Sequence, residues 1–321
     1  MKNSLTENLI YVIKKSIPDN EYVVNALMDI LCIGKESAYR RMRGDVPFTF
    51  DEAAKVAAKL GFSLDSVVGI NDDKKALFSL NFLKPGDLID NYCRQLEYYI
   101  DIFRRMNRAK ESMAQLAVNA LPYSLYLPFA HLSKFRLYRY IYQANGVSSN
   151  HSDFSQVEIP SYVSDIQNAF VKEYVAIKKA IFILDRNVFQ SIVYDINYFS
   201  KLNLISKEDV DVLKDELFLL LADLEKLTLS GKHEEGTDVQ VYLANVDLGT
   251  SYAYHEFDGI GYSNLRVYSI DAIDSQNANV CIRQKQWIES LRRCSTLITQ
   301  SGEMQRFEYF KTQRAIVSSL I

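Results

Sequence analysis

A short basic segment between residues 35 and 43 carries the side chains whose chemistry is easiest to assign. Its charged residues are four basic and one acidic, which gives a local charge of +3: Lys35, Glu36, Arg40, Arg41 and Arg43. Gly34 can close the turn before this segment, and Gly44 can end it, so the segment is predicted to be a helix. Cationic groups on one short helix can bind phosphate oxygens and the edges of bases. Such a layout suits DNA.

Further helices are predicted around the basic one. Apolar residues recur at helical spacing in the two segments before it, so each should turn one face to a core. Thr49 and Glu52 match a capping box, in which each side chain bonds to the other residue's backbone N–H at the start of a helix. The expected helices span residues 4–17, 22–31, 35–43 and 50–60, and a last short one begins at Ser63.

This succession resembles the helix-turn-helix domain of the Cro and lambda-repressor type. The matching residues are 31–34 at the turn, Arg40, Arg43 and Gly44 at the end of the basic helix, Pro47 in the loop, 54–61 in the next helix and 63–67 after it. Two positions depart from the family pattern: Cys32 replaces a turn glycine, and Val24 replaces a glutamine that caps the second helix and touches phosphate. The resemblance implies a five-helix lambda-repressor-like domain over residues 1–70 that binds double-stranded DNA.

The resemblance also implies a role for each polar residue of the basic helix. In this geometry the start of the recognition helix faces base edges, and arginines toward its end reach phosphates. Base contacts are expected from four residues, Lys35, Glu36, Ser37 and Arg40. We expect Tyr39 to pack against a sugar or a thymine methyl, and Arg41 and Arg43 to contact the DNA backbone. The alternative is that these charges form only the solvated face of a small helix.

Length, composition and charge restrict the class of protein. The chain has 321 residues, 48% of them hydrophobic and 24% charged, which is ordinary for a globular protein of two or three domains. The net charge is −3, so affinity for nucleic acid must come from a local patch. No apolar run approaches the length of a bilayer span, and residues 1–17 have a helical pattern instead of a signal-peptide core, so we expect no membrane partner and a cytoplasmic location.

The rest of the chain is expected to form a larger domain over residues 88–321, after a linker over 71–87 that contains a Pro-Gly breaker. Hydrophobic periodicity predicts helices at about 87–119, 128–143, 160–185, 187–200, 206–230, 278–300 and 303–320. Alternating residues at 239–243, 252–257 and 265–270 predict three antiparallel strands. The fold class is therefore mainly α, with a small antiparallel sheet near residues 237–274 that gives this part an α+β character.

Two apolar features of the larger domain allow more than one interpretation. Leucines and a valine recur every three or four residues from Val210 to Leu227, which fits either a dimer surface or an ordinary core helix. A set of tyrosines could line an amphipathic pocket or could be half-buried core residues: Tyr92, Tyr98, Tyr99, Tyr138, Tyr140, Tyr142, Tyr252, Tyr254 and Tyr268. A basic cluster, Arg104, Arg105, Arg108 and Lys110, is either a solvated helix face or a second nucleic-acid surface.

No pattern in the chain predicts catalysis or a bound metal. The histidines are far apart and have no ligand spacing, and His255 with Glu256 is interpreted as part of a strand: His131, His151, His233 and His255. The cysteines contain no Cys-x-x-Cys pair, so neither a disulfide framework nor a zinc site is expected: Cys32, Cys93, Cys281 and Cys294. We expect no cofactor and no enzyme activity.

The sequence thus predicts a transcriptional regulator. A helix-turn-helix domain would bind double-stranded DNA as a homodimer, because a single small domain makes too few contacts for specific binding. The larger domain would oligomerise or respond to a small-molecule or protein effector. The alternative is a protein–protein interaction module that uses the helix-turn-helix fold without sequence-specific DNA binding.

Overall fold

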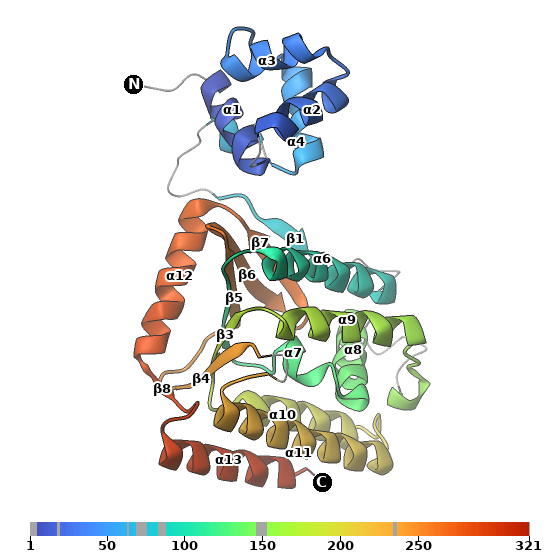
Figure 1. The fold of residues 1–321 in the computed structure, drawn as a ribbon. Coiled ribbons are helices and arrows are strands. Elements are labelled where there is room, and N and C mark those ends of the chain that lie inside the picture. Colours follow the sequence, from blue (N-terminus) through green and yellow to red (C-terminus); the bar gives the residue numbers. More distant parts are fainter. Residues whose placement is uncertain are drawn as a thin grey trace. The chain divides into compact units, whose positions relative to one another are not determined.

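The computed structural model describes residues 5–17, 20–62, 64–68, 76–82, 88–145, 153–233 and 236–320. The chain divides into two compact units, Met1–Lys75 and Ala76–Ile321, and each is described here by itself (Figure 1). Ser63, His151 and most of the segment expected to be a linker lie outside the described residues.

The N-terminal unit is helical. Its helices are α1 (Leu5–Ser16), α2 (Asn20–Leu31), α3 (Lys35–Arg43), α4 (Phe50–Leu60) and α5 (Leu64–Val68). Four of them have nine to twelve residues, whereas α5 has five, little more than one turn of 3.6 residues. The expected five-helix domain is therefore wrong as stated, because the unit has four full helices and α5 is little more than a single turn. Their apolar faces meet in one small core around Ile13, Leu27 and Val56.

The turn between α2 and α3 contains a strained residue. Cys32 has φ +54°, in the left-handed region that favours glycine, and it stands where the resembling family has one. The Ile33 backbone N–H donates to the carbonyl of Met28 at 3.3 Å, the bond that closes a Schellman motif. Gly44, with φ +81°, ends α3 in the same way. The backbone path at the turn is therefore kept although the glycine is absent.

The capping box predicted for α4 is confirmed. The Thr49 hydroxyl accepts from the Glu52 N–H at 3.2 Å, and the Glu52 carboxylate accepts from the Thr49 N–H at 3.0 Å. Both bonds satisfy backbone donors that the first turn of a helix leaves free.

The larger unit is built on one mixed sheet of eight strands in the order β1-β7-β6-β5-β2-β3-β4-β8. The strands are β1 (Ser79–Asn81), β2 (Ser112–Val118), β3 (Lys179–Leu184), β4 (Asp238–Ala244), β5 (Tyr252–Phe257), β6 (Ile260–Tyr268), β7 (Asp271–Ser275) and β8 (Ser295–Leu297). The pairs β2–β3 and β3–β4 are parallel, and the other pairs are antiparallel. β1 lies within the range expected to be a linker and pairs with β7.

This sheet overturns the predicted fold class. The unit is α+β with a large mixed sheet, and not mainly α with three antiparallel strands. Three strands lie inside segments expected to be helical: β2 follows α6 (Leu88–Arg108), β3 follows α9 (Ser161–Val175), and β8 follows α12 (Ala278–Arg293). β2 and β3 are buried along almost their whole length, and a strand buried on both faces has no alternating pattern.

Helices cover both faces of the sheet (Figure 1). The remaining ones are α7 (Tyr123–Tyr126), α8 (Ala130–Asn145), α10 (Val188–Lys201), α11 (Lys207–Ser230) and α13 (Glu303–Ser318), with a short 3-10 turn at Phe154–Gln156. α12 lies on one face, and its Ile288 packs in a cluster with Ala117 and Ile183 of β2 and β3. Leu116 and Phe182, one residue earlier on each strand, belong to the larger core on the opposite face.

The repeating leucines of α11 belong to that larger core. Every member from Val210 to Leu227 is at most 8% exposed: Val210, Leu213, Leu217, Leu220, Leu224 and Leu227. The core-helix interpretation is therefore confirmed, and these side chains are not available as a dimer surface.

Candidate functional site

The polar face of α3 presents most of the residues expected to contact DNA. Ala38 is fully buried in the N-terminal core and fixes which side of the helix faces inward. Six of the seven expected contact residues are exposed: Lys35, Glu36, Ser37, Tyr39, Arg40 and Arg43. Positions 36, 39, 40 and 43 follow the spacing i, i+3, i+4, i+7, so these side chains share one face.

Arg41 is the exception, because its guanidinium is bound within the unit. Its Nη2 and Nε lie 2.7 and 3.1 Å from the two carboxylate oxygens of Glu52, a bidentate pair between α3 and α4. The two side chains are only 15% and 19% exposed. The Arg41 guanidinium lowers the pKa of Glu52, which keeps the carboxylate charged. Arg41 therefore ties α3 to α4, the helix that follows it.

The other cations of α3 differ in how far they are neutralised. Arg43 forms exposed ion pairs with Asp45 at 2.9 Å and Glu36 at 3.3 Å, and exposed pairs are weak and easily exchanged. Lys35 and Arg40 form no ion pair with any residue that the structure describes. These two side chains, with Arg43, are the groups of α3 that an anion could reach.

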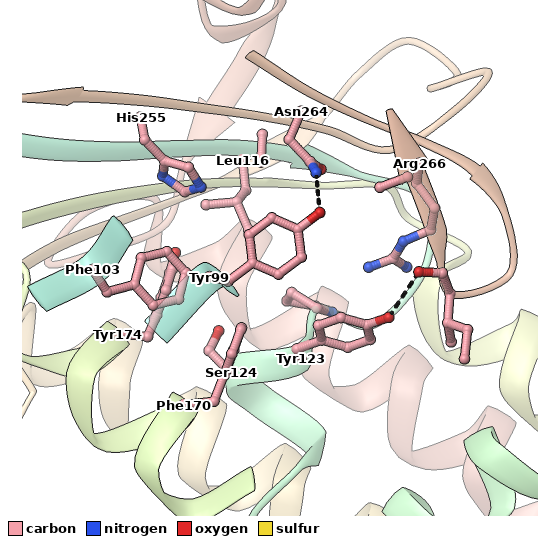
Figure 2. A pocket seen from close by; sticks show the side chains of 14 residues that line it. Tyr99, Phe103, Leu116, Tyr123, Ser124, Phe170, Tyr174, His255, Asn264 and Arg266 are labelled. Atoms are coloured by element: carbon pink, nitrogen blue, oxygen red, sulfur yellow. Dashed lines mark hydrogen bonds between the residues drawn. The ribbon is translucent and has the colours of Figure 1, made fainter. Parts of the chain in front are cut away.

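A separate site lies inside the larger unit, a cavity of about 80 Å³ (Figure 2). Its walls come from α6, α7 and α9 on one side and from β2, β5 and β6 on the other. Five of the fourteen lining residues are aromatic: Tyr99, Phe103, Tyr123, Phe170 and Tyr174. The sheet contributes the polar side chains His255, Asn264 and Arg266. Alternation along β5 and β6 directs these residues toward the helices.

Some polar groups of this cavity bind one another. The Asn264 side-chain amide donates to the Tyr99 hydroxyl at 2.9 Å, and the Tyr123 hydroxyl donates to the Ile270 carbonyl at 3.2 Å, as Figure 2 shows. Burial raises the pKa of Tyr99 and of Tyr123, so both phenols stay neutral. These bonds fix the two rings in the cavity wall.

Four other polar atoms of the lining are shielded from solvent and have no hydrogen-bond partner in the described part of the chain. They are Ser124 Oγ, Tyr174 Oη, His255 Nδ1 and Arg266 Nη1. Buried polar atoms are nearly always paired in native proteins, so a concentration of four around one cavity is unusual. Burial lowers the pKa of His255 to about 4, and it also lowers the pKa of Arg266.

No local pattern in the sequence predicts this cavity. Of the tyrosines proposed for a pocket, only Tyr99 lines the cavity; most of the others lie in the core, and Tyr268 is exposed. His255 was interpreted only as a strand residue. The usable signal was its position on the inward-facing side of an alternating strand, where a histidine is rare.

The basic cluster on α6 shows no feature of a second nucleic-acid surface. Arg104 pairs with Asp101 and with Glu173 of α9, and the Arg105 guanidinium lies 5.8 Å from the centre of the Phe257 ring. These contacts support the interpretation as a solvated helix face.

A second, open cleft lies where β2 and β3 end, the edge at which parallel sheets often bind ligands. It contains Asp185, Asp195 and Asp247. The Asp185 carboxylate already accepts from the backbone N–H groups of Asn187 and Leu248, and Asp195 pairs with Arg139. Two of its three acids are thus engaged in holding loops and helices.

Among the described residues, no group of three or more His, Cys, Asp or Glu side chains is arranged to hold a metal ion. None of the four cysteines, all of which are described, forms a disulfide. No helix in the described part of the chain is long and apolar enough to cross a bilayer.

Comparison with known proteins leaves the family open: no family model, no curated protein and no solved structure matches this chain.

Proposed function

We propose that this protein is a sequence-specific DNA-binding transcriptional regulator that acts as a homodimer. The observation that carries the proposal is the exposed face of α3, where Lys35 and Arg40 are unpaired with described residues and Arg43 is only weakly paired. These residues lie on α3, a short helix that follows α2 after a tight turn. Helix-turn-helix domains present their recognition helix to the major groove in this way.

Within this proposal the α3 residues have different tasks. Lys35, Glu36, Ser37 and Arg40 contact base edges, and Tyr39 packs on a sugar or a thymine methyl. Arg43 exchanges its two exposed carboxylate partners for a phosphate. Arg41 orients α3 through Glu52 and leaves the phosphate role that its position in the sequence suggested.

A dimer follows from the size of this surface. One nine-residue helix offers few contacts, whereas two copies on half-sites about 10 base pairs apart double them. The net charge of −3 supports a specific and local contact, because the chain as a whole does not attract DNA.

The test is selection of the full-length protein on a randomised duplex pool near physiological salt. We expect an enriched inverted repeat with half-sites one helical turn apart. Arg40→Ala should weaken binding to that site and relax one base position. Lys59→Ala removes one exposed cation of α4 and serves as the matched control, which should keep the sequence preference. A folded protein that enriches no sequence would contradict the proposal.

A second candidate function is protein recognition through the same unit. Phe50, the first residue of α4, is 79% exposed, and the Arg41–Glu52 pair holds this end of α4 at α3. A large exposed aromatic side chain is more typical of a protein contact than of a phosphate contact. DNA binding that is absent or insensitive to salt would favour this candidate, with Phe50→Ser as the variant that should then release the partner.

A further inference from the structure

We propose that the cavity between the sheet and helices α6, α7 and α9 binds a small monocarboxylate with an apolar body, held by the Arg266 guanidinium. The inference concerns the larger unit and is tested without DNA. It rests on the proposed function only where it assigns the ligand a regulatory effect.

The cavity wall carries a positive charge that has no ion-pair partner among the described residues. Arg266 forms no ion pair with any described residue, and its Nη1 is shielded from water without a hydrogen-bond partner. Arg136 lies close enough to affect its charge, is 4% exposed and also has no ion pair among the described residues. Arg139, a third arginine near Arg136 and Arg266, is paired with Asp195. A buried cation without a counter-charge is unfavourable, and a bound anion relieves this.

The size and polarity of the cavity match a small monocarboxylate. A volume of about 80 Å³ corresponds to two or three waters of about 30 Å³ each and suits an acid with only a few carbon atoms. Phe103, Phe170 and Leu116 supply apolar wall, which would favour hydrocarbon over a second charged group. Only one guanidinium lines the cavity, so a monoanion matches it better than a phosphate dianion.

Several hydrogen-bonding groups of the lining have no partner among the described residues. Tyr174 and His255 are 3% and 6% exposed, and their Oη and Nδ1 atoms are unpartnered in the described structure. The Tyr174 and Ser124 hydroxyls can donate to ligand oxygens, and a neutral His255 can donate or accept. Tyr123 lies beneath the guanidinium at 5.3 Å, which holds the cation in place while leaving its N–H groups available.

The experiment measures binding to the full-length protein at pH 7 by calorimetry and by thermal shift. The probes are acetate and propanoate, small enough for this cavity, with acetamide, propanamide and inorganic phosphate for comparison. We expect saturable binding of at least one carboxylate, with no comparable binding of its amide or of phosphate. Arg266→Gln should weaken that binding by about tenfold or more, since a hydrogen-bonded charge is lost. Arg283→Gln, an exposed site on α12, is the matched control and should bind normally.

Tyr174→Phe and Ser124→Ala keep the proposal testable if Arg266→Gln does not fold. Each removes a hydroxyl that has no partner, so the melting temperature without ligand should not fall, whereas carboxylate affinity should drop severalfold. If these hydroxyls had only a structural role, the melting temperature without ligand would fall and the carboxylate affinity would not. Binding unchanged in all three variants, equal binding of the amide, preferential binding of phosphate, or no binding by the folded protein would each overturn the proposal.

The effect of the bound carboxylate on DNA binding is tested separately. If both proposals hold, the carboxylate that binds should change the affinity for the selected DNA site in the wild type and not in Arg266→Gln. Carboxylate binding without any DNA binding would remove the proposed function and leave the site intact. DNA binding without carboxylate binding would overturn the ligand site and leave the proposed function intact.

Discussion

At the scale of single residues, Cys32 shows a backbone conformation kept against the preference of its side chain. A non-glycine residue in the left-handed region is disfavoured by roughly 1–2 kcal/mol. Cys32 has φ +54° in the turn that aims α3, and its thiol is exposed and makes only a long contact to the Asp29 carbonyl at 3.9 Å. The side chain therefore contributes little that offsets the strain.

We accordingly predict that Cys32→Gly stabilises the protein. Relief of the strain, reduced by the greater flexibility of glycine in the unfolded chain, should raise the free energy of unfolding by roughly 0.5–1 kcal/mol. Urea denaturation monitored by circular dichroism measures it. Cys32→Ala is the matched control, since it removes the thiol and keeps the strain, and an equal gain in that variant would contradict this explanation.

His255 gives a prediction about pH. Its folded pKa of about 4 lies below the ordinary value of 6.5, so between these values the unfolded chain binds the proton and the folded chain does not. Stability from this residue is therefore complete above pH 6.5 and is lost as the pH falls toward 4. At pH 5 the loss amounts to about 2 kcal/mol.

Replacing this histidine isolates its contribution. His255→Gln should flatten the fall in unfolding free energy between pH 6.5 and 4.5, measured as the difference from the wild type. The difference matters because burial raises the pKa of Asp274 to about 6, which acts with the opposite sign in both proteins. Parallel pH curves for the two proteins would exclude a neutral, buried His255 in the native state.

The sequence predicted the residues of α3 better than those of the cavity. The exposed positions of α3 could be identified because Ala38 and the flanking glycines define a short amphipathic helix. The role expected for Arg41 could not be corrected from sequence, because its partner Glu52 lies on another helix and already belonged to a recognised capping box. Arg266 and His255 are brought together by strand pairing, which local patterns do not specify.

At the scale of secondary-structure elements, the Arg41–Glu52 pair is the main polar tie between α3 and α4. We predict that a double-mutant cycle with Arg41→Ala and Glu52→Gln gives a coupling free energy of about 1 kcal/mol, more than an exposed pair because both side chains are mostly buried. Urea titrations of the four proteins measure it. Arg43→Ala with Asp45→Ala is the comparison cycle, and a coupling there as large as at Arg41 would contradict the distinction.

The elements that were predicted wrongly are those whose pattern fits two structures. Tyr92, Tyr99 and Met106 of α6 recur every seven residues, and Met113 of β2 continues this spacing by coincidence, so the sequence predicted a helix that extends into β2. The buried run of β3 likewise continued the apolar pattern of α9. Antiparallel β5 and β6 were found because they alternate. Parallel pairing of β4 with β3 depends on residues about sixty positions apart and has no local signal.

α11 offers a test of core against interface. Leu217 is fully buried in the core of its own unit. We predict that Leu217→Ala lowers the free energy of unfolding by about 3 kcal/mol, as expected for a large-to-small change in a core. Sedimentation of the folded variant should give the same oligomeric state as the wild type. A variant of unchanged stability that dissociates would instead restore the dimer-surface interpretation.

At the scale of the whole molecule, the net negative charge of the chain and the local positive charge of α3 would have opposite effects on an approaching DNA. A net charge of −3 does not draw the protein to DNA, so affinity depends on the few exposed cations near the contact. Asp45 and Glu36 pair with Arg43. If the proposed DNA binding holds, these carboxylates would compete with phosphate for Arg43, and binding to DNA that lacks the right bases would be weak.

The salt dependence of DNA binding therefore reports both the contact and the number of subunits that make it. Each phosphate contact contributes about 0.9 to the slope of log affinity against log salt concentration. Arg43→Ala should weaken all sequences alike and reduce that slope by about two if two subunits bind, and by about one if one subunit binds. Asp45→Asn, which releases Arg43 from its nearer carboxylate, should raise affinity on all sequences. Anisotropy titrations measure the affinity of both variants at salt concentrations from about 50 to about 200 mM, where counterion release is pronounced. An unchanged slope in Arg43→Ala would show that Arg43 does not contact phosphate.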